Sequence, residues 1–311
     1  MSNPETMVWL NGEMVVADRA RLSHLTHTFH YGLGAFEGIR SYEIKPGVGA
    51  VFRLQEHIDR LFGSCHLITI TAKDIGLTRA AVVEACVATL KANKLAGGYL
   101  RPVIYLGEGT MGIGATTNPT HTMIAAWRWG AYLGDDGLAK GIDACISSYQ
   151  RPGHAGTLSK AKLTGQYINS ILAKREALSN GFGEAILLNE NGLVTEASGE
   201  NLFIVKDGVL ITPPLGLNIL AGITRATILE LASQLGIPAV ERVFARDELY
   251  LADEVFMTGT AAEVTPVRSV DRRAIGAGAR GPITERLQSL YFDVVKGRSD
   301  AHAAWLTYFD L

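Results

Sequence analysis

The spacing of hydrophobic and polar residues along the chain predicts strands and helices in alternation. Short apolar or alternating runs bounded by turn residues are typical of strands. We expect strands at Met7–Leu10, Glu13–Val16, Phe36–Tyr42, Gly49–Arg53, Tyr99–Leu106, His121–Trp127, Ile142–Tyr149, Glu184–Leu188, Leu193–Ala197, Asn201–Val205, Val209–Thr212, Glu254–Thr258 and Glu263–Val270. Longer amphipathic segments predict helices at Leu54–Cys65, Arg79–Asn93, Tyr167–Ser179, Ile223–Leu235 and Ile283–Val295. The expected fold class is α/β or α+β, with helices on the faces of mixed sheets.

One stretch near the middle of the chain has no such periodicity. Residues Trp129–Gly141 contain the turn-like run Gly134-Asp-Asp-Gly137, which is typical of a linker. A chain of 311 residues also exceeds the usual size of one domain. We therefore expect a smaller N-terminal domain over residues 1–128, an interdomain loop over 129–140 and a larger domain over 141–311.

Composition argues against several classes of function. The 29 Lys and Arg residues are scattered and balance 31 Asp and Glu residues, whereas a nucleic-acid binder needs a clustered basic face. We expect no membrane span, because no apolar run is long enough, and no signal peptide. Cys65, Cys86 and Cys145 form no C-x-x-C pair, which favours a reducing, cytoplasmic location over a disulfide framework or a zinc ribbon. Charged residues make up 19%, below the usual share of about 25%, which indicates surface hidden in an oligomer.

Two patterns resemble functional motifs without the context that those motifs need. Residues 107–112 fit the dinucleotide pattern G-x-G-x-x-G, but no helix is predicted after them. His24, His27 and His30 are spaced by three, in a segment that we interpret as loop or strand, where this spacing does not bring side chains together. We expect packing histidines rather than a metal site. The pattern G-x-S-x-G of hydrolases is absent from the sequence.

The most informative stretch lies between Leu158 and Thr265. Lys160 and Lys162 stand where a loop meets a helix, and a lysine among apolar neighbours readily becomes an amine nucleophile. Glu196 and Glu200 are four residues apart, so on one strand they would share a face. Two buried acids need a cationic partner, and a protonated pyridine is one candidate.

Two further segments favour binding of an anion. Gly222-Ile-Thr-Arg225 opens a predicted helix, whose first N–H groups and positive dipole end suit a phosphate. Thr258-Gly-Thr-Ala-Ala262 is a loop of small residues, where backbone can approach an anion closely. Together with the lysines and acids, these segments indicate a small anionic cofactor that carries a carbonyl group.

At this point the sequence resembles a known family. The relevant motifs are Glu196-x-Ser-x-x-Asn-Leu-Phe203, Leu220-x-Gly-Ile-x-Arg225, His30-Tyr-Gly-x-x-x-Phe-Glu-Gly-Ile-Arg40 and Leu249-Tyr-Leu-Ala-Asp-Glu-Val-Phe-Met-x-Gly-Thr-Ala-Ala262. They resemble the class IV pyridoxal-phosphate aminotransferases, and within them the branched-chain amino-acid aminotransferases. The resemblance covers nearly the whole chain. It implies a small N-terminal α/β domain and a larger C-terminal pseudo-barrel domain.

The resemblance also implies a role for individual residues. Lys162 is similar to the Schiff-base lysine, Glu196 to the acid facing the pyridine nitrogen, and Tyr167 to the tyrosine that binds the phenolic oxygen. The phosphate would be held by Arg60 and by the N–H groups of Ile223, Thr224 and Thr260, with Gly259 also at the cofactor. The residues that match substrate-pocket positions are Tyr31, Phe36, Gly38, Arg101, Met111, Ile113, Tyr132, Thr260 and Ala261.

The activity implied by the resemblance is transfer of the amino group of branched-chain L-amino acids to 2-oxoglutarate, with pyridoxal 5'-phosphate as cofactor. Expected partners are these small molecules and further copies of the chain, as a homodimer or a trimer of dimers, and neither nucleic acid nor membrane. The alternatives are a D-amino-acid or an (R)-amine transaminase on the same fold, an aminodeoxychorismate lyase and a non-catalytic anion-binding protein. Arg101-Pro-Val103 departs from the Arg-x-His trap of the D-amino-acid enzymes.

Overall fold

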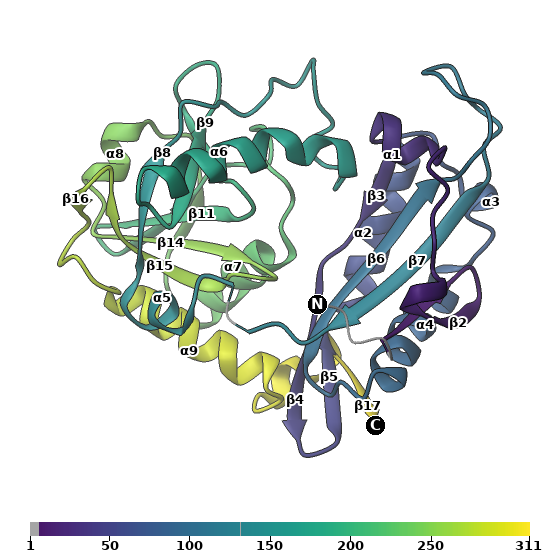
Figure 1. Cartoon of the computed structure of the whole chain (residues 1–311). Coiled ribbons are helices and arrows are strands. Elements are labelled where there is room, and N and C mark those ends of the chain that lie inside the picture. Colours follow the sequence, from purple (N-terminus) through teal and green to yellow (C-terminus); the bar gives the residue numbers. More distant parts are fainter. Residues whose placement is uncertain (1–5, 131) are drawn as a thin grey trace. The chain divides into compact units, whose positions relative to one another are not determined.

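The computed structural model describes residues 6–130 and 132–311, and at Asp135 only the backbone, and it divides the chain into two compact units (Figure 1). Unit 1 comprises the chain up to Trp129 together with residues 161–166 and 294–311, and unit 2 comprises residues 130–160 and 167–293. This division differs from the expected one in two places. A short segment around Lys162 and the last eighteen residues belong to the first unit, although both lie beyond the expected interdomain loop.

Unit 1 is built on an antiparallel sheet that draws strands from both ends of the chain. Its described strands are β1 (Met7–Leu10), β2 (Glu13–Val16), β3 (Gly34–Phe36), β4 (Ile39–Lys45), β5 (Val48–Phe52), β6 (Gly98–Leu106), β7 (Thr120–Trp127) and β17 (Leu306–Asp310). Their order is β17-β5-β4-β6-β7-β1-β2, with β3 paired to β6. The strand predicted at Phe36–Tyr42 is divided into two strands at Glu37 and Gly38, although Glu37 N still donates to Pro102 O of β6 and the pairing keeps one register across the break.

Helices cover this sheet and supply much of its core. They are α1 (His27–Tyr31), α2 (Leu54–Leu67), α3 (Ala72–Ile75) and α4 (Arg79–Ala92), with 3-10 turns at Ala17–Arg19, Thr164–Gln166 and Asp300–Trp305. The amphipathic period predicted for α2 is confirmed, since Leu54, Ile58 and Leu61 are all buried in the core of unit 1. Burying an aliphatic side chain of this size contributes about 2 kcal/mol, so this face fixes the helix against the sheet.

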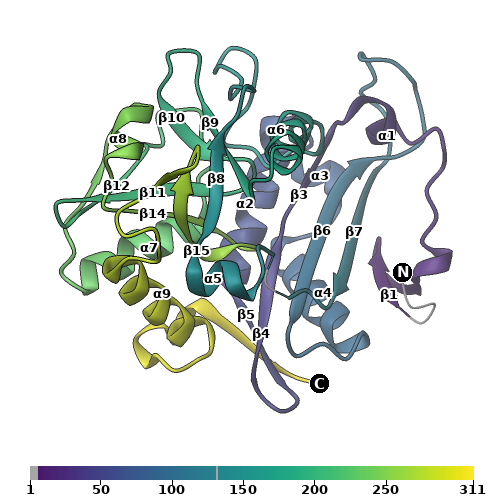
Figure 2. The same cartoon turned by 60° about the vertical axis from the view of Figure 1, so that its left-hand side comes forward.

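Unit 2 contains a sheet that closes on itself (Figure 2). Its described strands are β8 (Ile142–Ile146), β9 (Glu184–Leu188), β10 (Val194–Ala197), β11 (Asn201–Lys206), β12 (Val209–Thr212), β13 (Ala239–Glu241), β14 (Glu254–Gly259), β15 (Glu263–Val270) and β16 (Arg273–Ala274). The order is β10-β9-β8-β15-β14-β11-β12-β13, and a further pairing of β10 with β11 makes the first six strands a barrel-like ring. The expected mixed α/β class and the barrel-like larger domain are confirmed.

The helices of unit 2 are α5 (Asp135–Lys140), α6 (Tyr167–Ser179), α7 (Ile223–Gln234), α8 (Arg246–Tyr250) and α9 (Pro282–Val295). Two expectations about short segments are wrong. Residues 135–140 form a helix within the expected loop, and His27–Tyr31 form a helix where we expected loop or strand. Helices of five or six residues are too short to show a hydrophobic period.

Candidate functional site

A buried carboxylate organises the first group of predicted residues, in unit 1. Glu37 lies between β3 and β4, and its carboxylate accepts from Arg60 Nε at 2.6 Å, from Arg60 Nη2 at 2.9 Å and from His57 Nδ1 at 2.7 Å. Burial alone would raise the pKa of Glu37, but the neighbouring Arg60 and His57 outweigh it and hold that pKa well below its usual range. Burial lowers the pKa of His57, so its neutral ring donates to the carboxylate. The bidentate contact fixes the direction of the Arg60 guanidinium.

The two candidate lysines have different surroundings. Lys162 belongs to unit 1, where its backbone N–H donates to Ser64 Oγ at 3.0 Å and its carbonyl accepts from Phe36 N at 3.0 Å. Its Nζ lies 5.1 Å from the centroid of the Phe36 ring. Lys160 belongs to unit 2, where its Nζ donates to carbonyl groups of the loop before α7, including that of Ile219 at 2.8 Å. The amine of Lys160 is thus engaged by backbone oxygens, whereas that of Lys162 lies against an aromatic ring.

Arg101 approaches the same aromatic ring from β6. Its guanidinium carbon lies 4.8 Å from the centroid of Phe36 and 5.6 Å from that of Tyr99, and its buried Nε has no hydrogen-bond partner among the described residues. Gly38 lies beside this group, because a Cβ added there would fall 1.9 Å from the Tyr99 hydroxyl. Tyr99 was not among the predicted site residues. Its place two residues before Arg101, on the same face of a predicted strand, is the signal that identifies it.

Three further predicted residues are exposed in unit 1. Tyr31 ends α1, Met111 and Ile113 lie in the loop between β6 and β7, and their exposed fractions are 44%, 39% and 95%. His27 joins the helix to the loop, since its Nε2 lies 3.0 Å from the carbonyl oxygen of Gly112 and its ring centroid 4.6 Å from that of Tyr31. This histidine therefore packs within unit 1, as expected.

A second polar group surrounds Glu196 in unit 2. Its Oε1 lies 2.8 Å from the Arg151 guanidinium, and its Oε2 accepts from Asn201 Nδ2 and from Leu220 N, each at 3.0 Å. The expectation that Glu196 and Glu200 share one face of a strand is wrong, because β10 ends one residue after Glu196 and a turn intervenes before β11. Arg151, which was not among the predicted site residues, supplies Glu196 with the cationic partner that we expected for a buried acid.

The expected anion-binding segments of unit 2 lie at a helix start and at a strand connection. Ile223 and Thr224 open α7, and Gly222 before them offers no side chain as a cap, so the positive end of the helix dipole favours an anion there. Gly259 is the last residue of β14, and Thr260 and Ala261 lie in the connection from β14 to β15. Just before this connection, the hydroxyl of Thr258 is buried without a hydrogen-bond partner among the described residues.

The remaining predicted residues of unit 2 are two tyrosines. Tyr167 is the first residue of α6, and Tyr132 precedes α5. The ring of Tyr132 lies 5.4 Å from Lys174 Nζ, which comes from α6. The structure thus divides the predicted residues equally between the two units. Arg60, Lys162, Phe36, Gly38 and Arg101 belong to unit 1, with Tyr31, Met111 and Ile113 as an exposed set, and the other eight belong to unit 2.

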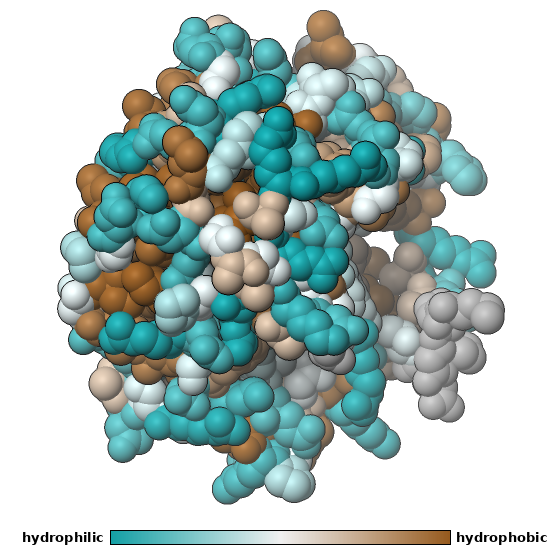
Figure 3. Space-filling view, turned by 90° about the vertical axis from the view of Figure 1, so that its left-hand side faces the viewer, coloured by the Kyte–Doolittle hydropathy of each residue, from teal (hydrophilic) through white to brown (hydrophobic). Residues whose placement is uncertain are grey.

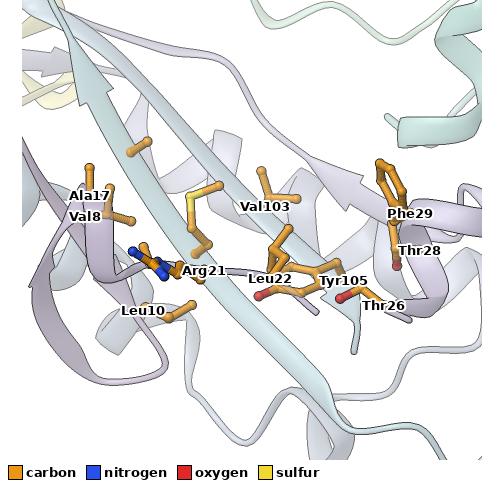
Figure 4. Close-up of a pocket in the computed structure, with 13 residues that line it drawn as sticks. Val8, Leu10, Ala17, Arg21, Leu22, Thr26, Thr28, Phe29, Val103 and Tyr105 are labelled. Atoms are coloured by element: carbon orange, nitrogen blue, oxygen red, sulfur yellow. The ribbon is translucent and has the colours of Figure 1, made fainter. Parts of the chain in front are cut away.

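A cavity of about 360 Å³ also lies in unit 1, but most of the side chains that line it are apolar (Figure 4). Figure 4 shows Tyr105, Leu22 and Val103 projecting toward it, with Arg21 at its edge. None of the predicted site residues lines it. Among the described residues, no group of three His, Cys, Asp or Glu side chains could hold a metal ion, and no helix is long and apolar enough to cross a membrane.

Comparison with known proteins gives a consistent result. Residues 34–270 match the family described as amino-transferase class IV. The chain is 48% identical over 307 residues to a branched-chain-amino-acid aminotransferase of Pseudomonas aeruginosa, covering 99% of this chain and 98% of that protein.

Solved structures of similar chains include two with the same activity in their names. The branched-chain amino acid aminotransferase of Escherichia coli has a TM-score of 0.93 and 43% identity, over 97% of this chain and 98% of that chain. The T.th. branched-chain amino acid aminotransferase complexed with N-(5'-phosphopyridoxyl)-L-glutamate has a TM-score of 0.91 and 40% identity, over 97% of this chain and 98% of that chain.

Proposed function

Because this chain belongs to the class IV aminotransferases, we propose that it transfers the amino group of branched-chain L-amino acids to 2-oxoglutarate, with pyridoxal 5'-phosphate as cofactor. One observation in the structure supports this most directly. The ring of Phe36 is approached by the Lys162 amine, 5.1 Å from its centroid, and by the Arg101 guanidinium, 4.8 Å from it. A nucleophilic amine, an apolar wall and a group that binds carboxylates therefore meet at one side chain.

The chemical groups present fit the proposed cofactor. Unit 1 offers the Lys162 amine for an aldehyde and a guanidinium at Arg60, held in place by Glu37, for a phosphate. Unit 2 offers the Glu196 carboxylate for a ring nitrogen and the start of α7 for an anion. When bound, pyridoxal phosphate supplies an electron-withdrawing ring that stabilises negative charge at the substrate Cα.

Lys162 is proposed to move the proton in both directions of the transfer. With the cofactor bound, the neutral amine of Lys162 would take the proton from the substrate Cα and deliver it to the carbon that the cofactor aldehyde provides, on the other side of the amino nitrogen. Glu196, whose carboxylate lies 2.8 Å from the Arg151 guanidinium, would hold a proton on the ring nitrogen of the bound cofactor. Tyr167 is assigned a hydrogen bond to the phenolic oxygen.

Substrate selection is assigned to two kinds of side chain. Phe36 and Tyr132 are proposed as apolar walls for a branched side chain, and Arg101 as the partner of the distal carboxylate of glutamate. Gly38, Thr260 and Ala261 leave backbone close to the substrate. The glutamate adduct in the similar T.th. structure supports 2-oxoglutarate as the amino acceptor.

The exposed apolar residues support self-association as a homodimer or a trimer of dimers. Phe29 is 74% exposed and Ile113 is 95% exposed, both in unit 1. Figure 3 shows further apolar patches among polar side chains on the visible face of the molecule. Such patches are costly unless a partner covers them. The three cysteines are free and buried, which supports function in a reducing, cytoplasmic compartment.

Two measurements test the proposal. Initial rates with 2-oxoglutarate as acceptor are compared for L-leucine, D-alanine and an (R)-amine as donors, and we expect activity with L-leucine alone. Reduction of the coloured holoprotein with borohydride, followed by peptide mass spectrometry, should place the pyridoxyl group on Lys162. A label on Lys160, or activity that prefers D-alanine or the (R)-amine, would overturn it.

A further inference from the structure

Two carboxyl groups lie together in the interior of unit 2 and take no part in the proposed chemistry. Glu184 of β9 is 0% exposed and Glu200, just before β11, is 5% exposed. Glu184 Oε2 lies 2.6 Å from Lys174 Nζ, and its Oε1 accepts from Ser198 Oγ at 2.6 Å and from Ala185 N at 2.8 Å. An ammonium and two further donors therefore satisfy Glu184 in its ionised form.

Among the described residues Glu200 is in no ion pair, since the ammonium of Lys174 is paired with Glu184. The Oε2 atom of Glu200 accepts from the neighbouring Gly199 N at 3.2 Å, and its carboxyl group makes a hydrogen bond with Glu184. Two carboxyl groups can share a hydrogen bond only if one of them carries a proton. The charges that act on Glu200 come from Glu184 of β9 and Lys174 of α6, and burial together with the Glu184 charge raises the pKa of Glu200 to about 8 against the effect of Lys174. The titratable thiol of Cys145, on β8, lies within the influence of Glu184.

This pair lies against residues that are assigned to the cofactor and the substrate. A Cβ added at Gly259 would lie 3.4 Å from Glu200 Cγ, so Glu200 packs directly on the connection Gly259–Ala261. Lys174, which pairs with Glu184, lies 5.4 Å from the centroid of the Tyr132 ring. The cluster of Glu184, Glu200 and Lys174 therefore lies against both Gly259 and the ring of Tyr132.

We propose that Glu200 is a neutral carboxylic acid that donates its proton to the Glu184 carboxylate, and that this pair positions the Gly259–Ala261 connection and Tyr132. With one proton, the two acids and Lys174 carry no net charge. Loss of that proton places two buried carboxylates beside a single ammonium, and their repulsion pushes Glu200 against Gly259. The positioning role rests on the proposed function, whereas the protonation of Glu200 does not.

The protonation is tested on the purified protein by infrared spectroscopy. A protonated acid has a carbonyl stretch above the amide bands, and we expect this band at neutral pH in the wild type but not in Glu200→Gln. If the band persists in Glu200→Gln, or is absent from the wild type, the proton is not on Glu200 and the proposal fails. The readout needs neither cofactor nor substrate, so it is independent of the transaminase assignment.

The pH dependence of stability gives a second test with a defined sign. Between the usual glutamate pKa of 4.5 and about 8, the folded protein holds one proton more at Glu200 than the unfolded chain does, so this group makes stability fall as pH rises. Glu200→Gln keeps a hydrogen-bond donor toward Glu184 and removes the group that titrates. We expect its Tm to rise relative to that of the wild type from about pH 5 to about pH 8. A Tm difference that is the same at both pH values would overturn the proposal.

The other member of the pair is the matched control. Glu184→Gln removes the ionised partner of Lys174 and should lower the Tm at both pH values, because it leaves a buried ammonium without its counter-charge. Glu184→Gln thus loses Tm at both pH values, whereas Glu200→Gln improves relative to the wild type as pH rises. Equal losses of Tm from Glu184→Gln and Glu200→Gln would mean that both acids are ionised, against the proposal.

The positioning role is tested by comparing a conservative with a truncating substitution. Glu200→Gln should leave the KM for L-leucine within about twofold, whereas Glu200→Ala should raise it at least about tenfold, since misplacing a site by about 1 Å can cost about a hundredfold. If Glu200→Ala leaves KM unchanged, or if both variants raise it equally while the infrared band behaves as expected, Glu200 holds a proton but does not position the site.

Discussion

Glu37 shows how a residue outside the predicted set decides what a predicted residue can do. The family resemblance identified Arg60, but the carboxylate that orients it lies twenty-three positions earlier and meets it only in the folded chain. The same holds for Arg151 beside Glu196 and for Tyr99 beside Gly38. Motifs give the groups that a ligand would touch, whereas their supporting partners depend on long-range packing that one sequence does not specify.

We expect Glu37→Gln to lower the free energy of unfolding by about 3 kcal/mol near neutral pH, because it leaves Arg60 without its buried counter-charge. Since the folded pKa of Glu37 is lowered, its contribution is present above the usual glutamate pKa of 4.5 and is lost as pH falls toward the folded value. Urea unfolding at a series of pH values measures the difference, which should shrink in acid.

An ion pair at the surface end of α2, the helix that carries Arg60, is the control for this experiment. Glu56 Oε1 lies 2.8 Å from Arg53 Nε, but Glu56 is 40% exposed. Glu56→Gln should change the free energy of unfolding by less than about 0.5 kcal/mol. A loss for Glu37→Gln that is no larger, or that is constant with pH, would contradict the ionised Glu37 described here.

Arg101 allows a test of how one pocket accepts two unlike substrates. Arg101→Met removes the charge but keeps an apolar stem against Phe36. We expect kcat/KM for glutamate to fall about 30-fold, the loss of a charge-assisted hydrogen bond of about 2 kcal/mol, and that for L-leucine to change by less than about threefold. Steady-state rates with each donor measure this. Equal losses for both substrates would remove Arg101 from the role of carboxylate partner.

At the scale of secondary-structure elements, a turn can be predicted from the local sequence, but the closure of the unit 2 sheet into a ring cannot. Asp207-Gly208, between the strands predicted at Asn201–Val205 and Val209–Thr212, is typical of a hairpin turn, and both residues adopt the positive φ that this turn needs, 49° and 77°. The pairing of β10 with β11 that closes the ring was not predictable as such, because a turn signal does not say which edges meet. Helices α1 and α5 escaped prediction because they have too few residues for a period.

Helix α9 depends on a cap from a distant strand. Glu254 of β14 accepts from Ile283 N at 2.9 Å, from Thr284 N at 2.7 Å and from Thr284 Oγ1 at 2.6 Å. We expect Glu254→Ala to lower the free energy of unfolding by about 2 kcal/mol, because it leaves the two buried donors of Thr284 and the part-buried N–H of Ile283 without an acceptor. Chemical unfolding followed by circular dichroism measures it.

The cap of α3, which comes from a residue next to that helix in the sequence, is the comparison for the long-range cap of α9. Thr71 caps α3, an exposed four-residue helix, through Asp74, and Thr71→Ala should cost about 0.5 kcal/mol. If Glu254→Ala costs no more than Thr71→Ala, the long-range cap does not stabilise α9 as the geometry indicates.

At the scale of the whole chain, the sequence predicted two domains but not which residues complete the first. The expected second domain ran to the C-terminal residue, yet β17 pairs with β5 along its length, from Leu306 opposite Phe52 to Asp310 opposite Val48. Such pairing joins positions about 250 residues apart. Neither periodicity nor turn chemistry carries information about contacts at that separation.

The return of the last strand to unit 1 leads to a prediction with an internal control. Phe309 is 6% exposed and packs in the core of unit 1, whereas its neighbour Tyr308 points to the other face of the strand and is 49% exposed. All four tryptophans, Trp9, Trp127, Trp129 and Trp305, belong to unit 1, so their fluorescence reports the unfolding of that unit. We expect Phe309→Ala to lower its free energy of unfolding by about 3 kcal/mol, and Tyr308→Ala by less than about 1 kcal/mol, since only the first opens a cavity. Similar effects of both substitutions on the fluorescence transition would mean that β17 does not hold unit 1 together.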